Sequence, residues 1–182
     1  LSVADEPHNL EEFPPRAMTD YKTYFEGHGE FCASASSKYF GSGATVATYV
    51  AYQAFDRKNK NAGNGWAGIT WNSVSSSYDT STGIVSTGAS LGGYAGEWLK
   101  LSLPYGVKIS GYQLGIRSAW FNYGPDNWVI LGSNDDKNWD LVSSVTTGRI
   151  AQGINGEQIM TKDFSVETTK YYKYLALVCS KV

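Results

Sequence analysis

The chain has 182 residues, of which 42% are hydrophobic and 14% aromatic, and its formal net charge at pH 7 is −2. A chain of this length buries about 70% of the surface that it exposes when unfolded, so one large domain can form its own core. The 15 lysine and arginine residues are scattered, which excludes the basic footprint of a nucleic-acid-binding protein. No apolar run approaches the roughly 20 residues of a transmembrane helix.

The first 28 residues differ from the rest of the chain. Residues 8–12 are polar and acidic, and Pro14 and Pro15 would interrupt a helix. Residues 18–25 include apolar side chains that would pair or pack, but they show no clean period. We therefore expect residues 1–28 to form an extended N-terminal arm, lying on the domain or on a neighbouring chain, and residues 29–182 to form the domain itself.

From residue 29 onward the pattern is that of an antiparallel β-protein. Short segments with apolar residues at every second position alternate with turns rich in Gly, Asn, Asp and Ser. The expected strands are residues 30–36, 97–103, 108–117, 128–133, 139–145 and 171–178. The apolar segment 47–55 is compatible with a helical turn. This spacing of strands predicts an all-β sandwich.

Five short motifs within these segments occur in a fixed order. Residues 33–37 read ASASS, residues 54–56 read AFD and precede Trp66, residues 96–101 read GEWLKL, residues 133–139 read SNDDKNW, and residues 171–175 read YYKYL. Together they resemble the discoidin family, also called the coagulation-factor C-type or galactose-binding-like domain, over about residues 29–182. The resemblance implies a β-sandwich jelly roll that meets its ligand with loops at one end.

Two features depart from the family pattern. The chain has Asp136 where the family prefers Gly, and the chain ends at Val182 without the family's last hairpin, which carries a Glu and a terminal Cys. A softer similarity concerns residues 14–19, which read PPRAMT. This preface is similar to that of discoidin-like modules in large algal DNA viruses and their hosts, where such modules occur in structural or surface proteins.

The resemblance implies that ligand-binding residues lie in loops 38–44, 57–65 and 118–126. The candidate residues are Arg117, Trp120, Phe121, Tyr123, Asn127, Tyr39, Phe40 and Asn64. Aromatic rings stack on the apolar face of a sugar, and neighbouring polar groups bind its hydroxyls, so this mixture is typical of a sugar site. The alternative is that the aromatic side chains of the third loop fold back onto the core or onto the N-terminal arm.

Family members often hold a structural calcium ion in the second of these loops. Calcium binds six to eight oxygen ligands, which Asp56, Asn59 and Asn61 would help to supply. Three basic residues interrupt this set, namely Arg57, Lys58 and Lys60. The alternative is a polar turn in which Asp56 accepts backbone hydrogen bonds. No other cofactor is expected.

The two cysteines, Cys32 and Cys179, lie in strand segments near the two ends of the domain. The first and last strands of a sandwich often lie side by side, so a disulfide between the two would close a long loop and contribute about 4 kcal/mol. The alternative is two buried free thiols, since free Cys is among the most buried residue types.

Two other patterns have structural explanations. Trp66, Trp98, Trp128 and Trp139 occupy strand positions and are expected in the core. Residues 88–92 match the Gly-x-Ser-x-Gly elbow of serine hydrolases. An elbow needs an apolar strand before it and an acid and His after it, whereas His8 and His28 come earlier. We therefore expect no enzyme activity.

The sequence favours a non-catalytic carbohydrate-binding or adhesion module that binds a glycan or glycoprotein. The alternative is a structural or assembly protein, of a virion or surface layer, whose arm and loops pack on partner chains. Membrane attachment is disfavoured because the aromatic loops lack a basic rim. Either function predicts a location outside the cell, at the cell surface or on a virion exterior.

Overall fold

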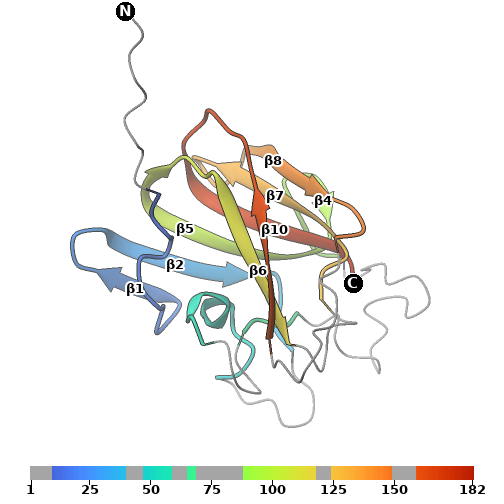
Figure 1. Ribbon diagram of the computed structural model, residues 1–182, viewed down its shortest axis with the longest axis horizontal. Coiled ribbons are helices and arrows are strands. Elements are labelled where there is room, and N and C mark those ends of the chain that lie inside the picture. The colour runs from blue at the N-terminus through green and yellow to red at the C-terminus, as the bar shows by residue number, and fades with distance from the viewer. Residues whose placement is uncertain (1–9, 40–46, 59–64, 69–87, 118–123, 149–158) are drawn as a thin grey trace, which may run out of the picture.

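The computed structural model describes residues 10–39, 47–58, 65–68, 88–117, 124–148 and 159–182. Within these ranges the chain forms antiparallel strands and one short 3₁₀ helix (Figure 1). The elements are β1 (Lys22–Phe25), β2 (Gly29–Ala35), η1 (Ala51–Phe55), β3 (Ser90–Leu91), β4 (Tyr94–Ala95), β5 (Glu97–Val107), β6 (Gly111–Arg117), β7 (Asn127–Ser133), β8 (Trp139–Val145), β9 (Ile159–Ser165) and β10 (Tyr172–Lys181). The predicted all-β class is confirmed.

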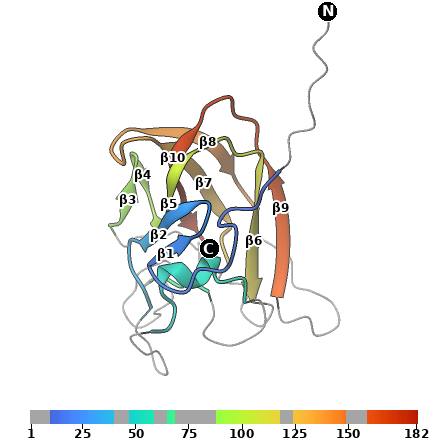
Figure 2. The same ribbon diagram turned by 90° about the vertical axis from the view of Figure 1, so that its left-hand side faces the viewer.

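The strands form two packed layers and a small hairpin. The main sheet has six strands in the order β1-β2-β5-β10-β7-β8, and β6 pairs with β9 in a separate two-stranded sheet. Figure 2 shows β6 and β9 on one side of the main sheet and the β3–β4 hairpin on the other. The predicted antiparallel sandwich is confirmed.

Side-chain alternation along the strands explains the core between the layers. Because successive residues of a strand point to opposite faces, Leu101 and Leu103 of β5 point inward together with Leu177 of β10. On β7, Trp128 is 1% exposed, and its ring meets the Phe164 ring of β9 edge to face at 5.1 Å. These contacts hold the small sheet against the main one.

The indole Nε1–H of Trp128 donates a hydrogen bond of 2.9 Å to the Tyr112 hydroxyl of β6. The buried polar atom of this large side chain is therefore paired, as burial requires. Of the four tryptophans expected in the core, Trp128 is buried, whereas Trp66, Trp98 and Trp139 are half-buried. Trp98 follows the inward-pointing Glu97, so strand alternation turns it to the outer face.

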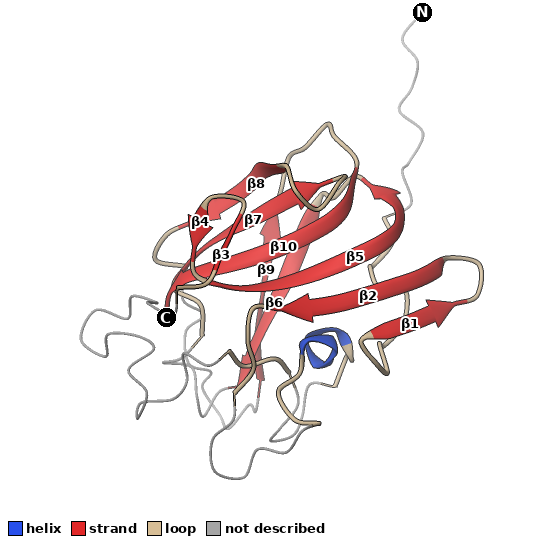
Figure 3. Cartoon of the chain, turned by 180° about the vertical axis from the view of Figure 1, so that it is seen from behind, coloured by secondary structure: helices blue, strands red, loops and turns tan. Residues whose placement is uncertain are grey.

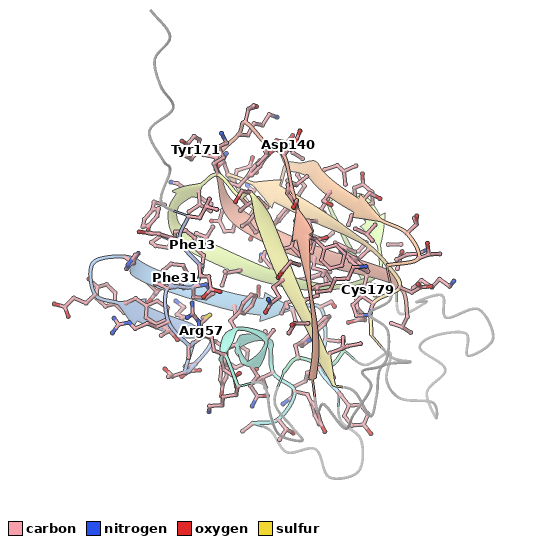
Figure 4. All side chains as sticks on the ribbon, viewed as in Figure 1. Phe13, Phe31, Arg57, Asp140, Tyr171 and Cys179 are labelled. Atoms are coloured by element: carbon pink, nitrogen blue, oxygen red, sulfur yellow. The ribbon has the colours of Figure 1, made fainter. Side chains whose placement is uncertain are left out.

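A second apolar cluster joins the N-terminal segment to the sheet. Phe31 of β2 is 0% exposed, and its ring contacts those of Phe13 and Phe25. Met18 is also buried, and its backbone N–H donates to the Phe55 carbonyl of η1 at 3.0 Å. Figure 4 shows Phe13 and Phe31 close together beside Arg57.

The residues expected to form an arm are therefore partly integrated into the sandwich. From Lys22 to Phe25 the chain is an edge strand of the main sheet, in register with Gly29 to Cys32 of β2. The guanidinium of Arg57 binds the Pro14 carbonyl at 2.7 Å and the Glu12 carboxylate at 3.0 Å. Residues 1–9 lie outside the described ranges, and the proposed division at residue 28 stays a prediction.

The turn between β7 and β8 has the chemistry that its sequence indicates. Asp135 accepts hydrogen bonds from the backbone N–H groups of Lys137 and Asn138 and from the Asn138 side chain, and these bonds hold the pKa of its carboxyl well below the usual range. Asp136, at the position where the related family prefers Gly, has a φ of 58°. Asp tolerates this left-handed conformation better than most residues.

The two cysteines are free thiols. Cys32 of β2 is opposite Ser102 of β5, whereas Cys179 of β10 is opposite Glu97 at the start of the same strand. At roughly 3.4 Å per residue these positions are about 17 Å apart along the strand direction, whereas a disulfide needs Cα atoms within about 7 Å. The disulfide is therefore wrong for this fold, and of the two free thiols Cys179 is buried whereas Cys32 is half-buried.

Replacement of the buried Phe31 tests the N-terminal cluster. Phe31→Ala is expected to lower the free energy of unfolding by about 3–5 kcal/mol, because it leaves a cavity between Phe13 and Phe25. The matched control is Tyr24→Ala on the neighbouring strand, since Tyr24 is 72% exposed, and its effect should be within about 0.5 kcal/mol. Urea unfolding measures both, and equal effects would contradict the assigned core.

Thiol labelling tests the cysteine assignment. Burial raises the pKa of the Cys179 thiol to about 12, so this group stays protonated and unreactive in the native protein at pH 8. A maleimide reagent should modify Cys32 alone in native protein, and both cysteines in guanidinium without reductant. Mass spectrometry gives the count, and unlabelled thiols in the denatured chain would indicate a disulfide.

Candidate functional site

Several strands begin or end at one end of the sandwich. The register places Glu97, the first residue of β5, opposite Cys179 of β10, and Cys179 opposite Trp128 of β7. Figure 3 shows these strand ends along the lower side of the molecule, together with η1 and the end of β6. The loops predicted to bind a ligand join the chain at this end.

The base of the third predicted loop is firmly held. The backbone N–H of Asp126 donates to the Lys181 carbonyl at 2.8 Å, and the Lys181 ammonium lies 3.0 Å from the Asp126 carboxylate. Next to it, the Asn127 side-chain oxygen accepts a hydrogen bond of 3.0 Å from the backbone N–H of Thr147. Asn127 therefore braces the start of β7 against the 145–148 turn.

A buried carboxylate organises the segments beside this base. Glu97 is 3% exposed, and its Oε2 atom accepts hydrogen bonds from the hydroxyls of Ser36, at 2.5 Å, and Ser37. The Ser36 hydroxyl also accepts the backbone N–H of Trp98 at 2.9 Å. A charged group in the interior is stable only when it is hydrogen-bonded in this way.

The segment 65–68 packs on the same carboxylate. The Trp66 Nε1–H donates to the Ser37 carbonyl at 2.8 Å. A Cβ atom on Gly68 would lie 3.1 Å from Glu97 Oε2, so only glycine fits here without displacing its neighbour. Glu97 thus contacts both the segment before the first predicted loop, at Ser36 and Ser37, and the segment after the second, at residues 65–68.

Two tyrosines lie next to the hydrogen-bonded frame formed by Ser36, Ser37, Trp66 and Glu97. The Tyr39 and Tyr49 rings meet edge to face, with centroids 5.5 Å apart and planes at 82°, and both side chains are half-buried. Ala67 holds both backbones: its carbonyl accepts the Tyr39 N–H at 2.8 Å, and its own N–H points to the Tyr49 carbonyl at 3.5 Å. Tyr39 was predicted from the sequence, whereas Tyr49 was not.

The predicted ligand residues divide into two groups. The structure places Tyr39 and Asn127 at the expected end, as well as the backbone of Arg117, the last residue of β6, opposite Ile159 of β9. The remaining candidates, which are Trp120, Phe121, Tyr123, Phe40 and Asn64, lie outside the described residues and stay predictions.

Asp56 of the predicted calcium set is buried at the end of η1. One of its carboxylate oxygens accepts the backbone N–H of Lys58 at 2.8 Å, which is the contact expected for a polar turn. Asn59 and Asn61 lie outside the described residues. In the described ranges, no three His, Cys, Asp or Glu side chains group as metal ligands. A calcium site therefore stays a prediction.

The Gly-x-Ser-x-Gly sequence does not form a nucleophile elbow. Ser90 and Leu91 form strand β3 of a hairpin, and Gly92 and Gly93 turn the chain into β4. A Cβ atom on Gly92 would lie 2.8 Å from the Cβ of Trp139, so the hairpin rests closely on the outer face of the main sheet. No helix follows Ser90, as an elbow would require.

Sequence reasoning missed Glu97 and Tyr49. A signal for Glu97 was present in the sequence. Residues 97, 99, 101 and 103 share one face of a strand, and the last three of these are leucines. A charge at such an inward position predicts a buried, paired carboxylate. No comparable signal marks Tyr49, because its position depends on contacts with residues distant in the sequence.

Comparison with known proteins shows a shared fold. No protein-family model and no curated protein matches the sequence. A solved family 32 carbohydrate-binding module from Clostridium perfringens, in complex with GalNAc-β-1,3-galactose, aligns with a TM-score of 0.55 and 16% identity, covering 83% of this chain and 84% of the module. At this identity the likeness establishes the β-sandwich fold, in agreement with the galactose-binding-like fold expected from the motifs.

Two further modules align less closely. The family 32 module of NanJ from C. perfringens, in complex with galactose, gives a TM-score of 0.49 at 16% identity, covering 83% of this chain and 82% of that chain. The family 32 module of EndoD from Streptococcus pneumoniae gives 0.47 at 9% identity, covering 82% and 84%. Separately, the described part of the chain contains no helix long and apolar enough to cross a membrane.

Removal of the Glu97 carboxylate tests whether its hydrogen bonds to Ser36 and Ser37 stabilise this end of the sandwich. Glu97→Ala is expected to lower the free energy of unfolding by about 2 kcal/mol, because the hydroxyls of Ser36 and Ser37 lose a charged acceptor. Glu30→Ala is the control, since the exposed Glu30 makes a 3.8 Å ion pair with Lys22 and a 3.6 Å contact with the Cys32 thiol, and its loss should change stability by less than about 0.5 kcal/mol. Guanidinium unfolding measures both variants. A Glu97→Ala variant with unchanged stability would refute the structural role assigned to the Glu97 carboxylate.

Proposed function

We propose that the chain is a non-catalytic carbohydrate-binding module that holds a glycan with the loops at the Glu97 end of the sandwich. The observation that carries the proposal is the fold shared with a module solved in complex with GalNAc-β-1,3-galactose. β-linked galactosides and N-acetylgalactosaminides are therefore the first ligands to test. The five sequence motifs that resemble the discoidin family support the same function independently.

The connectivity of the strands supports the location of the site. β6 ends at Arg117 and β7 begins at Asn127, so the segment with Trp120, Phe121 and Tyr123 leaves and re-enters the sandwich between these two positions. A sugar ring offers an apolar face for aromatic stacking and a rim of hydroxyls for hydrogen bonds. Three aromatic residues beside an arginine match both requirements.

A site of this kind binds one sugar weakly. Strong attachment to a glycan-covered surface would therefore come from several linked modules acting together. We place the protein accordingly on the outside of the cell or at a cell surface, where its ligand would be a glycan or glycoprotein. A calcium ion at Asp56, and the similarity to modules of algal viruses, remain predictions within this proposal.

Mutation of Trp120 tests the proposed function. Trp120→Ala is expected to weaken binding to GalNAc-β-1,3-galactose at least tenfold, because a stacking surface is lost, without a change in Tm. Tyr171→Ala is the matched control, because this 62% exposed ring lies at the opposite end of the molecule (Figure 4). Titration calorimetry and a glycan array provide the measurements.

The outcomes separate this function from its alternative. If the wild-type chain binds no saccharide on the array, the carbohydrate proposal fails. If the chain also self-associates at micromolar concentration in sedimentation experiments, a structural or assembly role is favoured instead. If Trp120→Ala binds the saccharide as well as the wild-type chain does, the proposed function stands, but the binding site does not include Trp120.

A further inference from the structure

We propose that Tyr39 and Tyr49 form a paired aromatic surface that contacts the glycan, and that Tyr49 is kept in a strained backbone conformation for this contact. The inference rests on the proposed function and extends its site to a residue outside the predicted loops. The ligand class is a pyranose ring, whose apolar face meets one tyrosine ring while its hydroxyls meet the phenol groups.

The first support is the position and exposure of the pair. Both side chains are half-buried at the end of the sandwich that carries the predicted loops, rather than inside either apolar cluster. Their edge-to-face arrangement at 5.5 Å fixes the two rings relative to each other. Tyrosine is well suited to such a surface, because it offers a large, rigid contact area with only two rotatable side-chain bonds.

The second support is the backbone of Tyr49, which has a φ of 58°. For a bulky residue with a Cβ atom this left-handed conformation is a genuine outlier, whereas Gly or Asn would adopt it at lower cost. Strain of this kind clusters at functional sites and persists only where the surroundings enforce it. Since the backbone conformation favours Gly or Asn at this position, we infer that the tyrosine is present for its ring.

The surroundings of Tyr49 do enforce its conformation. The next residue, Val50, is 1% exposed and anchors the chain in the interior. The Gln53 side chain clamps the segment from the other side, because its oxygen accepts the Val50 N–H at 3.2 Å and its nitrogen donates to the Ala47 carbonyl at 3.1 Å. With Ala67 on the Tyr49 carbonyl, three separate hydrogen bonds hold Ala47, Tyr49 and Val50.

The third support is the frame beneath the pair. Ala67, which binds the backbones of both tyrosines, follows Trp66, and the Trp66 indole is fixed to Ser37. Ser37 in turn donates to the buried Glu97 carboxylate. The two rings are thus presented on a hydrogen-bonded frame that is in place before any ligand arrives, which reduces the ordering cost of binding.

A variant of Tyr49 can separate a binding role from a structural one. Tyr49→Asn removes the ring and suits the left-handed backbone, so the backbone strain falls while a ligand contact is lost. We expect the affinity for GalNAc-β-1,3-galactose to fall about tenfold or more, and the Tm to stay level or rise by about 2–4 °C. A loss of affinity without a loss of thermal stability identifies a residue kept for binding.

The matched control is Tyr21→Asn. Tyr21 makes an equivalent edge-to-face contact with Tyr52 at 5.4 Å, but it precedes the edge strand β1 and has a backbone outside the left-handed region. Its replacement should leave affinity unchanged and should not raise the Tm. Tyr39→Ala, measured beside it, should lower affinity in the same way as Tyr49→Asn.

Each result has one reading. If wild-type chain binds the disaccharide and Tyr49→Asn binds equally well, the inference is overturned while the proposed function stands. If Tyr49→Asn loses both affinity and thermal stability, Tyr49 is a structural residue and the inference is also overturned. If wild-type chain binds no saccharide at all, the proposed function itself has failed.

Discussion

The pairing of β5 with β10 is the constraint on which the rest of the structure depends. These are the two longest strands of the main sheet, and they lie at its centre. Their register decides which side chains point inward, because a slip of one residue would turn every leucine of β5 to the outer face. The same register places Glu97 beside Cys179 and Trp128, so it also assembles the candidate site.

Two different interactions then close the sandwich on the inner face. The Trp128 ring packs against Phe164 and bonds to Tyr112, which holds the small sheet in place. The N-terminal segment covers the rest of this face with Phe13 and Met18. Since Arg57 binds the carbonyl of Pro14, this covering segment is also fixed to the start of the second predicted loop, and the core and the candidate site share one support.

The candidate site combines a buried charge with a strained backbone, and both are costly features in a small core. The Glu97 carboxylate is compensated by two serine hydroxyls, and the conformation of Tyr49 is enforced by Val50 and Gln53. Asp136 in the β7–β8 turn has the same φ of 58° as Tyr49, but Asp tolerates this conformation better than a bulky residue does. The proposed ligand-binding role would account for the occurrence of both where the predicted loops meet the sandwich.

The sequence by itself determined the β class, six of the ten described strands and the β7–β8 turn, because these depend on local alternation and turn chemistry. The end of the fold where a ligand is expected came from the resemblance to the discoidin family and stays a prediction. Only the tertiary structure decided that residues 22–25 join the main sheet, that residues 159–165 pair with β6, and that Cys32 and Cys179 are too far apart to bond. It alone brought Tyr49 to Tyr39 and Ser37 to Glu97. Such contacts join residues distant in the chain, and strand register, which no local pattern encodes, determines which of them meet.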